Sequence, residues 1–172
     1  IKICVARAGN VIGGGDWAED RIVPETAKSW IKNKELNIRN PLATRPWQHV
    51  LEPLGGYLTL ARKLHQNPNL NGEAFNFGPN ADESRTVLDL IKELSKYWDN
   101  LLYNQDYDND KFHESNLLKL NCDKALHYLD WKSRLSFNET IEISTKWYKK
   151  YYTNPKKIRE YSYEQICYYE KL

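Results

Sequence analysis

The chain has 172 residues, enough for one domain with a hydrophobic core and a small extension. Hydrophobic residues make up 41% and charged residues 28%, and no apolar run approaches the roughly 20 residues that a membrane-spanning helix needs. The net charge is +2, and acidic residues are interspersed among the basic ones, which argues against a dedicated nucleic-acid-binding protein.

A run of apolar, mostly β-branched residues opens the chain at positions 1–6. Because both faces of this run are apolar, it predicts a central strand of a parallel sheet that helices cover on both sides. Such a strand needs sheet neighbours, and none precedes it. The chain also lacks Met and begins with Ile1, so we expect it to be a piece of a longer protein.

A glycine-rich loop follows this strand and reads Gly13-Gly14-Gly15-Asp16-Trp17. It would lie at the carboxyl end of the strand, the edge of an open α/β sheet at which ligands bind. The glycines permit movement but match neither the GxGxxG fingerprint nor the P-loop, so they predict no cofactor-phosphate site. We predict that Asp16 and Trp17 form a lid over the ligand, and a plain surface loop is the alternative.

Helices and strands alternate over the rest of the chain. Asp20 is predicted to cap a helix that runs to about Lys32, and Thr86 to cap an amphipathic helix that runs to Trp98. Other helices are expected over 50–66, 123–129 and 138–152, and strands over 36–39, 73–77 and 101–103. The helix over 50–66 is predicted to bury its apolar residues, Val50, Leu51, Leu54, Leu58 and Ala61. A carboxy-terminal extension, expected to be helical, covers 153–172.

The segment Arg45-Pro46-Trp47-Gln48-His49-Val50 connects a polar loop to the first turn of the helix over 50–66. Pro41 and Pro46 favour an extended backbone at the entry. The segment therefore presents the Arg45 guanidinium beside backbone N–H groups, an arrangement that suits an anion such as a phosphate. The alternative is that Arg45 forms a local salt bridge and Trp47 only packs.

Few residues point to catalysis. The four histidines show no metal-ligand spacing, and the three cysteines lie far apart, which indicates reduced thiols in a cytoplasmic protein and no metal site. Two Tyr-x-x-x-Lys pairs occur, but Tyr107–Lys111 lies in a polar loop and Pro155 interrupts Tyr152–Lys156. The sequence therefore predicts a chain that holds a ligand and carries no catalytic residue of its own.

Four stretches stand out as motifs: ARAGNVIGGGDW at 6–17, RIVP at 21–24, RPWQHVLEPL at 45–54 and FNFGP at 75–79. Together they resemble the CDP-glucose 4,6-dehydratase family of the extended short-chain dehydrogenase/reductase (SDR) superfamily, over residues 1 to about 151. The resemblance implies an α/β fold, the carboxy-terminal part of an extended SDR Rossmann fold. Residues 1–152 would form a late sheet strand and a mixed α/β substrate-binding region, with 153–172 as the extension.

The resemblance implies an NAD-dependent lyase in its full-length form. Such an enzyme takes hydride from C4 of the glucose of CDP-glucose, removes water across C5 and C6, and returns the hydride at C6. The product is CDP-4-keto-6-deoxyglucose, a precursor of dideoxy sugars in surface polysaccharide. The glycine fingerprint and the catalytic residues would lie upstream, so the 172-residue chain alone is expected to be inactive. The full-length enzyme is expected to be a cytoplasmic homo-oligomer without membrane or nucleic-acid partners.

The resemblance also assigns roles to single residues. Arg45 would clamp the diphosphate, and Ala8 and Gly9 would approach the nicotinamide of NAD. A second diphosphate arginine has no clear equivalent, and His113 is predicted to take part in its place. The remaining substrate-binding positions implied by the resemblance are Asn10, Arg21, Ile38 and Arg39.

Two other functions stay open. A nucleotide-sugar epimerase would share the fold, and the acid–base residues that separate it from a dehydratase would lie upstream. A binding or assembly module without catalysis is the alternative from a different class. The residues do not decide which nucleotide base is bound.

Overall fold

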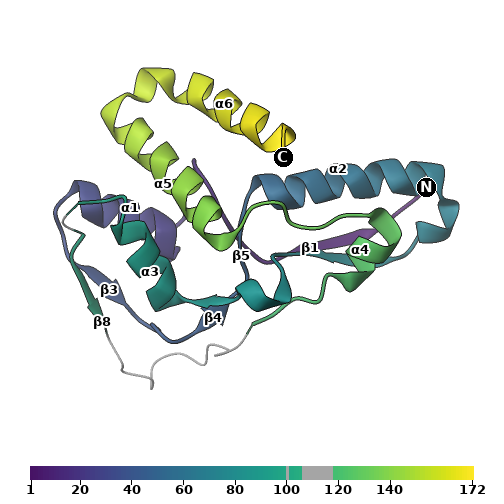
Figure 1. Ribbon diagram of the computed structural model, residues 1–172, viewed down its shortest axis with the longest axis horizontal. Helices are drawn as coiled ribbons and strands as arrows, with labels where there is room; N and C mark the ends of the chain where they lie inside the picture. The colour runs from purple at the N-terminus through teal and green to yellow at the C-terminus, as the bar shows by residue number, and fades with distance from the viewer. Residues whose placement is uncertain (100, 106–117) are drawn as a thin grey trace.

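Parallel pairs of short strands, connected through helices, form the framework of the molecule. The computed structural model describes residues 1–99, 101–105 and 118–172, and over these ranges the structure is mixed α/β (Figure 1). Three ladders pair β1 (Val5–Ala8) with β6 (Ala74–Phe77), β2 (Asn10–Ile12) with β5 (Trp47–His49), and β3 (Leu36–Ile38) with β8 (Tyr103–Gln105), all parallel. A fourth, antiparallel ladder pairs β4 (Thr44–Arg45) with β7 (Arg85–Thr86).

The helices begin and end close to their predicted bounds. The predicted cap at Thr86 is confirmed, since its side chain and that of Asp89 form a capping box, and Ser136 and Glu139 form another. Within the described ranges, no helix has both the length and the hydrophobicity to cross a membrane. The α-helices are α1 (Ile22–Ile31), α2 (Leu51–Gln66), α3 (Val87–Ser95), α4 (Asp123–Leu129), α5 (Phe137–Thr153) and α6 (Ile158–Glu170). Short 3-10 turns occupy Pro68–Leu70, Ala81–Glu83 and Pro155–Lys157.

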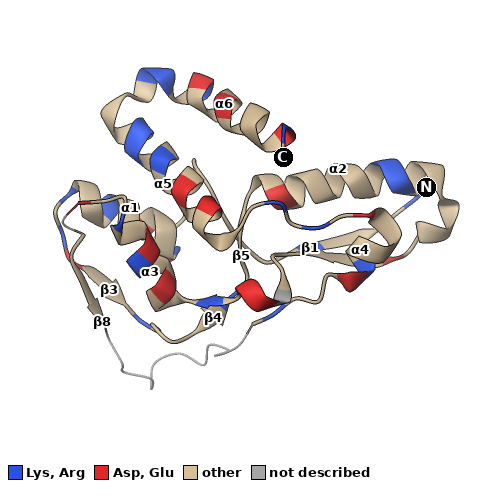
Figure 2. Ribbon diagram, viewed as in Figure 1, with Lys and Arg blue, Asp and Glu red and all other residues tan. Residues whose placement is uncertain are grey.

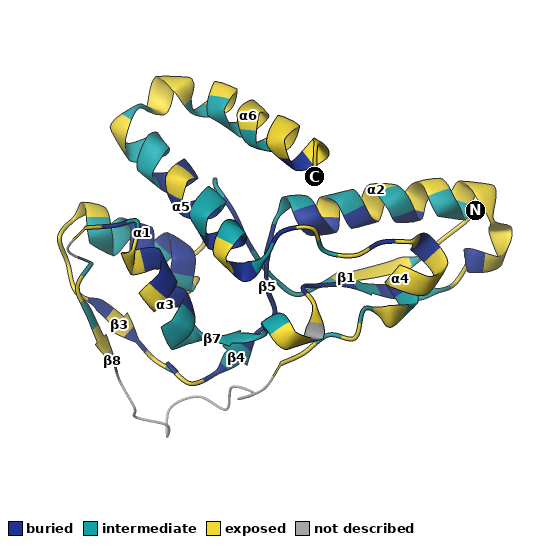
Figure 3. Cartoon of the chain, in the orientation of Figure 1, coloured by how far each residue is buried: buried dark blue, intermediate teal, exposed yellow. Residues whose placement is uncertain are grey.

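Two hydrophobic clusters form the interior (Figure 3). The larger cluster packs α1, α3 and α5 against β3, and the smaller one packs α2 and α4 against β6. The larger cluster contains Val23, Ala27, Ile38, Trp47, Leu90, Ile91, Leu94, Trp98, Ile141 and Tyr148, among others. The smaller contains Leu60, Leu70, Phe75, Phe77, Ala125, Leu129 and Trp131.

The first strand differs from its prediction in bounds and in burial. It runs over Val5–Ala8 rather than 1–6, and among the described strands only β6 pairs with it. Val5 is 49% exposed and Ile3 is 62% exposed, so the described residues do not cover both faces of the strand. The parallel pairing is confirmed. The other edge of β1 leaves backbone N–H and C=O groups open to a further strand.

The buried face of α2 is not the predicted one. Leu54 and Leu58 are 48% and 74% exposed, whereas Gly56 and Leu60 face the interior. A Cβ atom at Gly56 would lie 2.3 Å from the ring of Phe77, so the glycine lets the helix approach β6 closely. The apolar periodicity therefore indicated the wrong face, because it gave a glycine no weight as an interior residue.

Asp20 does not cap α1, contrary to the prediction. Its φ of 60° lies in the left-handed region, and Arg21 occupies the N-cap position. The Asp20 carboxylate forms an ion pair with Arg39, and its backbone N–H donates to Glu25 Oε1 at 2.9 Å. The start of α1 is thus connected to the end of β3 at the surface.

A buried carboxylate connects three distant segments. Glu52 lies in the first turn of α2 and has no exposed surface. Its Oε1 accepts the backbone N–H groups of Arg134 and Leu135 at 2.8 and 2.7 Å, and its Oε2 accepts the hydroxyl of Tyr169 at 2.8 Å. Tyr169 belongs to α6, so the carboxy-terminal helix folds back along α5 and reaches the start of α2 (Figure 1).

Replacing Tyr169 by Phe should lower the free energy of unfolding by about 1.5–3 kcal/mol, because a hydrogen bond to a buried charge is lost. Urea unfolding followed by circular dichroism measures this change. Tyr168→Phe is the matched control, since Tyr168 is 45% exposed, and it should shift stability by less than about 0.5 kcal/mol. Equal stabilities of the two variants would contradict the proposed importance of this contact.

Candidate functional site

Three segments from distant parts of the sequence meet at the carboxyl end of β1. Gly9 donates its N–H to the Phe77 oxygen at 3.1 Å, and Asn10 donates its N–H to the Pro46 oxygen at 3.0 Å. Asn10 then pairs with Trp47 in the β2–β5 ladder. A Cβ atom at Gly9 would lie 2.6 Å from the Pro46 oxygen, so only glycine permits this approach. Asn10 therefore lies beside the segment that begins with Arg45, at the sheet edge where α/β folds bind ligands.

Arg45 lies in β4 and is only 8% exposed. Its Nη1 donates to the Thr44 carbonyl oxygen at 2.9 Å. Arg85 is its direct partner in β7, and the indole Nε1 of Trp47 donates to the Arg85 carbonyl oxygen at 3.1 Å. Two arginines thus stand opposite each other in one short ladder, and a guanidinium group is suited to bind a phosphate.

Gln48 and His49 continue this segment into the interior, where they are 1% and 2% exposed. Gln48 Nε2 donates to the Phe77 oxygen at 2.8 Å, which connects β5 to the end of β6. His49 Nδ1 accepts the N–H of Leu51 at 3.3 Å, and burial lowers the pKa of His49 from 6.5 to about 4. In the described part of the chain, Gln48 Oε1 and His49 Nε2 have no hydrogen-bond partner. The imidazole is therefore neutral at pH 7 and orders the first turn of α2.

The residues of the predicted lid lie against α5. Tyr148 donates its hydroxyl to the Asp16 carbonyl oxygen at 2.8 Å, and burial raises the pKa of this tyrosine. A Cβ atom at Gly14 would lie 2.0 Å from the ring of Trp147, so the loop backbone touches the indole. The ring of Trp17 packs at centroid distances of 4.8 to 6.4 Å against four rings of α5, those of Trp147, Tyr148, Tyr151 and Tyr152. The loop is thus anchored, and any closure over a ligand must rearrange these contacts.

The other predicted substrate-binding residues lie around β3 and α1. Ile38 is 1% exposed within the larger cluster and pairs with Gln105 in the β3–β8 ladder, so the residue is buried. Arg39 follows β3 and pairs with Asp20, and Arg21 is exposed at the N-cap of α1. Of these three residues, the structure thus leaves the two arginines accessible at the surface. His113 lies outside the described residues.

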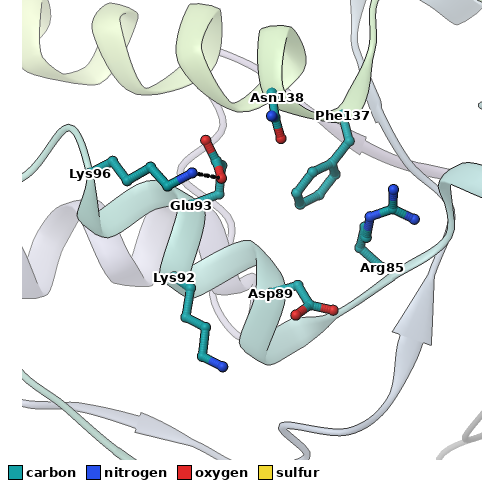
Figure 4. A pocket seen from close by; sticks show the side chains of 7 residues that line it. All are labelled: Arg85, Asp89, Lys92, Glu93, Lys96, Phe137 and Asn138. Carbon is teal, nitrogen blue, oxygen red and sulfur yellow. Dashed lines mark hydrogen bonds and ion pairs between the residues drawn. The ribbon is translucent and has the colours of Figure 1, made fainter.

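The sequence analysis did not single out Arg85 or Gln48. Gln48 reads as an ordinary strand residue, and Arg85 stands in a polar stretch whose capping box predicts a helix start but no pairing with β4. Arg85 also lines an open groove beside α3 and the start of α5 (Figure 4). Acidic and basic residues alternate along α3 (Figure 2), and Figure 4 shows their side chains at the groove. Its lining residues are Arg85, Asp89, Lys92, Glu93, Lys96, Phe137 and Asn138.

Two sequence predictions concern a cofactor and a metal. Ala8 and Gly9 lie at the end of β1, the strand end that the resemblance places near NAD, and a Cβ atom at Gly9 would lie 2.6 Å from the Pro46 oxygen. Within the described ranges, no group of three or more His, Cys, Asp or Glu side chains is arranged to hold a metal ion.

The chain is 41% identical over 150 residues to CDP-glucose 4,6-dehydratase of Salmonella typhimurium, a match that covers 87% of this chain and 42% of that protein. It superimposes with a TM-score of 0.68 and 18% identity on dTDP-glucose 4,6-dehydratase from Bacillus anthracis in complex with NAD, covering 86% and 44% of the two chains. On UDP-glucose-4-epimerase from Stenotrophomonas maltophila, with bound NAD and formylated UDP-arabinopyranose, the TM-score is 0.74 at 16% identity, covering 87% and 48%. No protein-family model matches.

These likenesses support two statements. The identity to the Salmonella protein shows common descent, and the superpositions show that the chain has the same fold as part of each of the two solved enzymes. The chain spans less than half the length of these relatives.

The buried His49 makes the stability of the chain depend on pH. The folded protein disfavours the imidazolium. The contribution of neutral His49 to the free energy of unfolding is therefore fully present above the unfolded pKa of 6.5, and it is lost as the pH falls toward 4. At pH 5 the loss relative to pH 8 should be about 2 kcal/mol. Urea unfolding at several pH values measures it.

His49→Asn preserves a hydrogen-bond acceptor and removes the titrating ring, so this part of the pH dependence should disappear even if the variant is less stable overall. His65→Gln, at an exposed position of α2, should keep the pH dependence of the unaltered chain. The assignment to His49 fails if the Asn variant loses stability between pH 8 and 5 as steeply as the unaltered chain does.

Proposed function

We propose that this chain, a homologue of CDP-glucose 4,6-dehydratase, supplies the nucleotide-sugar-binding part of an NAD-dependent dehydratase that converts CDP-glucose to CDP-4-keto-6-deoxyglucose. The observation that carries the proposal is the meeting of Asn10 with the segment 45–49 at the carboxyl end of β1. The identity of 41% to the Salmonella enzyme supports it.

In this proposal the residues of the chain bind and orient the nucleotide sugar. Arg45 holds the diphosphate, because a guanidinium can meet phosphate oxygens with two parallel hydrogen bonds. Asn10 contacts the ligand at the same edge of the sheet. NAD, when bound, would supply the hydride exchange between C4 and C6 of the sugar.

The open edge of β1 supports a further part of the proposal. Among the described strands only β6 pairs with β1, and a parallel strand whose other edge is open and whose apolar side chains are exposed is suited to pair with another strand. We propose that the NAD-binding portion of the enzyme pairs there, and that the 172-residue chain alone forms no 4-keto sugar.

A nucleotide-sugar epimerase is the second candidate. The superposition on the Stenotrophomonas epimerase has a TM-score of 0.74, against 0.68 for the Bacillus dehydratase. At 16% and 18% identity both likenesses concern the fold alone, whereas the 41% identity favours a dehydratase. Calorimetric titration with CDP-glucose and UDP-glucose tests the choice, because the dehydratase relative is named for a cytidine nucleotide and the epimerase for a uridine nucleotide. Clear preference for UDP-glucose would favour the epimerase.

Arg45→Ala should weaken the binding of CDP-glucose by roughly 10- to 150-fold, because hydrogen bonds to a charged group contribute about 1.5–3 kcal/mol. Arg45→Lys keeps the charge but loses the planar fork, so it should weaken binding less. Isothermal titration calorimetry on the 172-residue chain measures both effects.

Arg62→Ala is the matched control, since it removes the same charge from an exposed position on α2, and it should leave the affinity unchanged. Melting temperatures of all variants separate binding from folding. A destabilised Arg45→Ala chain that binds CDP-glucose normally would mean that Arg45 is only structural.

We further propose that the loop around Asp16 and Trp17 closes over the sugar. Saturation with CDP-glucose should then slow hydrogen exchange across residues 13–18, as measured by mass spectrometry. Peptides from α4 serve as an internal reference whose exchange should not change. If the chain binds CDP-glucose but exchange in the loop does not change, the loop does not close over the sugar and is a plain surface loop.

A further inference from the structure

The carboxy-terminal helix α6 holds one indole ring of α5, on which it folds back (Figure 1). Trp147 lies in α5 and is 9% exposed, and its Nε1 donates to the Ser162 hydroxyl oxygen of α6 at 2.9 Å. The Ser162 hydroxyl donates its own proton to the Ile158 carbonyl oxygen at 2.9 Å, so its lone pairs remain to accept the indole N–H. The orientation of the Trp147 ring is therefore set by α6 as well as by packing.

The same ring supports the backbone of the glycine loop. A Cβ atom at Gly14 would lie 2.0 Å from Cδ2 of Trp147 and 2.4 Å from its Cε2, so the backbone lies directly against the indole. Gly15 has a φ of 86°, which L side chains rarely adopt, and a Cβ atom there would lie 3.9 Å from the same ring. The course of the loop thus follows the surface of the indole over two residues.

The other end of the loop borders the candidate site. The loop continues β2, the strand that begins with Asn10. A Cβ atom at Gly13 would lie 2.8 Å from Cγ1 of Val50 and 3.6 Å from Nε2 of His49. The loop therefore stands between the segment 45–49 and α5, and a shift of the Trp147 ring would change the backbone that borders the site.

The observed position of the loop is an anchored one. The hydrogen bond from Tyr148 to the Asp16 carbonyl oxygen and the contact of the Trp17 ring with Tyr151 both hold it against α5. Closure over a ligand has to break such contacts. A ligand that binds only the closed loop has an apparent affinity proportional to the fraction of molecules in which the loop is already closed.

We propose that Trp147 is a positioning residue for the loop 13–17, and that α6, through Ser162, holds this loop in its anchored position. The contact is autoinhibitory, because a bond that stabilises the anchored loop lowers the fraction of molecules with a closed loop. This inference rests on the proposed function, since the anchor opposes the proposed closure over the sugar. It gives the carboxy-terminal extension a regulatory part in ligand binding.

The first test measures the loop of the 172-residue chain without ligand, by hydrogen exchange and mass spectrometry. Ser162→Ala removes the acceptor of the indole N–H. Exchange across residues 13–18 should become about 2- to 10-fold faster, because a neutral hydrogen bond contributes roughly that factor to an equilibrium. Ser162→Thr keeps the hydroxyl and should restore the exchange rate of the unaltered chain.

Gln165→Ala is the matched control. Gln165 Nε2 donates to the Ile143 oxygen at 2.9 Å, so this variant also loses one hydrogen bond between α6 and α5 but leaves Ser162 and Trp147 intact. It should lower the midpoint of urea unfolding about as much as Ser162→Ala does and leave exchange in the loop unchanged. Equally fast loop exchange in both variants would overturn the role of Trp147, since a general loosening of α6 would then be enough.

The second test is the affinity for CDP-glucose, measured by calorimetric titration. Removing a residue that only supports the fold weakens binding or leaves it unchanged, whereas removing an autoinhibitory contact strengthens binding. Ser162→Ala should therefore bind CDP-glucose about 2- to 10-fold more tightly than the unaltered chain. Ser162→Thr and Gln165→Ala should bind it as the unaltered chain does. Circular dichroism checks that each variant is folded. If Ser162→Ala is not, Trp147→Phe takes its place, because it keeps an aromatic ring and removes the donor.

Unchanged loop exchange in the folded variant would overturn this inference, and so would a CDP-glucose affinity that stays the same or falls. In either case, binding of CDP-glucose by the unaltered chain would leave the proposed function intact. If the unaltered chain bound no CDP-glucose, the proposed function itself would be wrong, and the autoinhibitory role of α6 with it.

Discussion

The arrangement of the carboxy-terminal helices depends on one buried negative charge. A carboxylate without access to water is stable only when donors surround it, and the donors of Glu52 come from the backbone at Arg134 and Leu135 and from the hydroxyl of Tyr169. Helix α2, the connection before α5, and α6 must therefore be in place together. Since α2 directly follows the segment 45–49, the same contact fixes where the candidate site stands relative to α6.

Backbone contacts, more than side chains, assemble the candidate site. The N–H groups of Gly9 and Asn10 bond to carbonyl oxygens of β6 and of Pro46, and the side-chain amide of Gln48 bonds to Phe77. These bonds require close approach of three chain segments, which the absent side chain of Gly9 allows. The site is thus a junction between two ladders, and Arg45 is positioned by β4 next to it.

Local signals in the sequence predicted most elements of the fold. The cap at Thr86, the helices over 50–66 and 138–152 and the strand over 73–77 depend on neighbours within a few residues, and the structure contains them. The buried face of α2 could not be predicted from such local signals. Two of its buried residues, Glu52 and Gly56, are not apolar side chains, and the residues that they contact lie far along the chain. For the site, the motifs indicated Asn10 and Arg45, but the pairing of Arg45 with Arg85 is a register between distant strands that no local pattern encodes.

The parallel ladders also determine the order in which the chain can fold. Each of them joins strands with at least one whole helix between them, so none can form from a local hairpin. Closing such long loops costs chain entropy before the contacts offset it, which slows folding. The α5–α6 pair, by contrast, joins sequence neighbours through the bonds Trp147–Ser162 and Gln165–Ile143. On contact-order grounds we expect the helical pair to form early and the β1–β6 pairing, which completes the sheet edge of the candidate site, to form late.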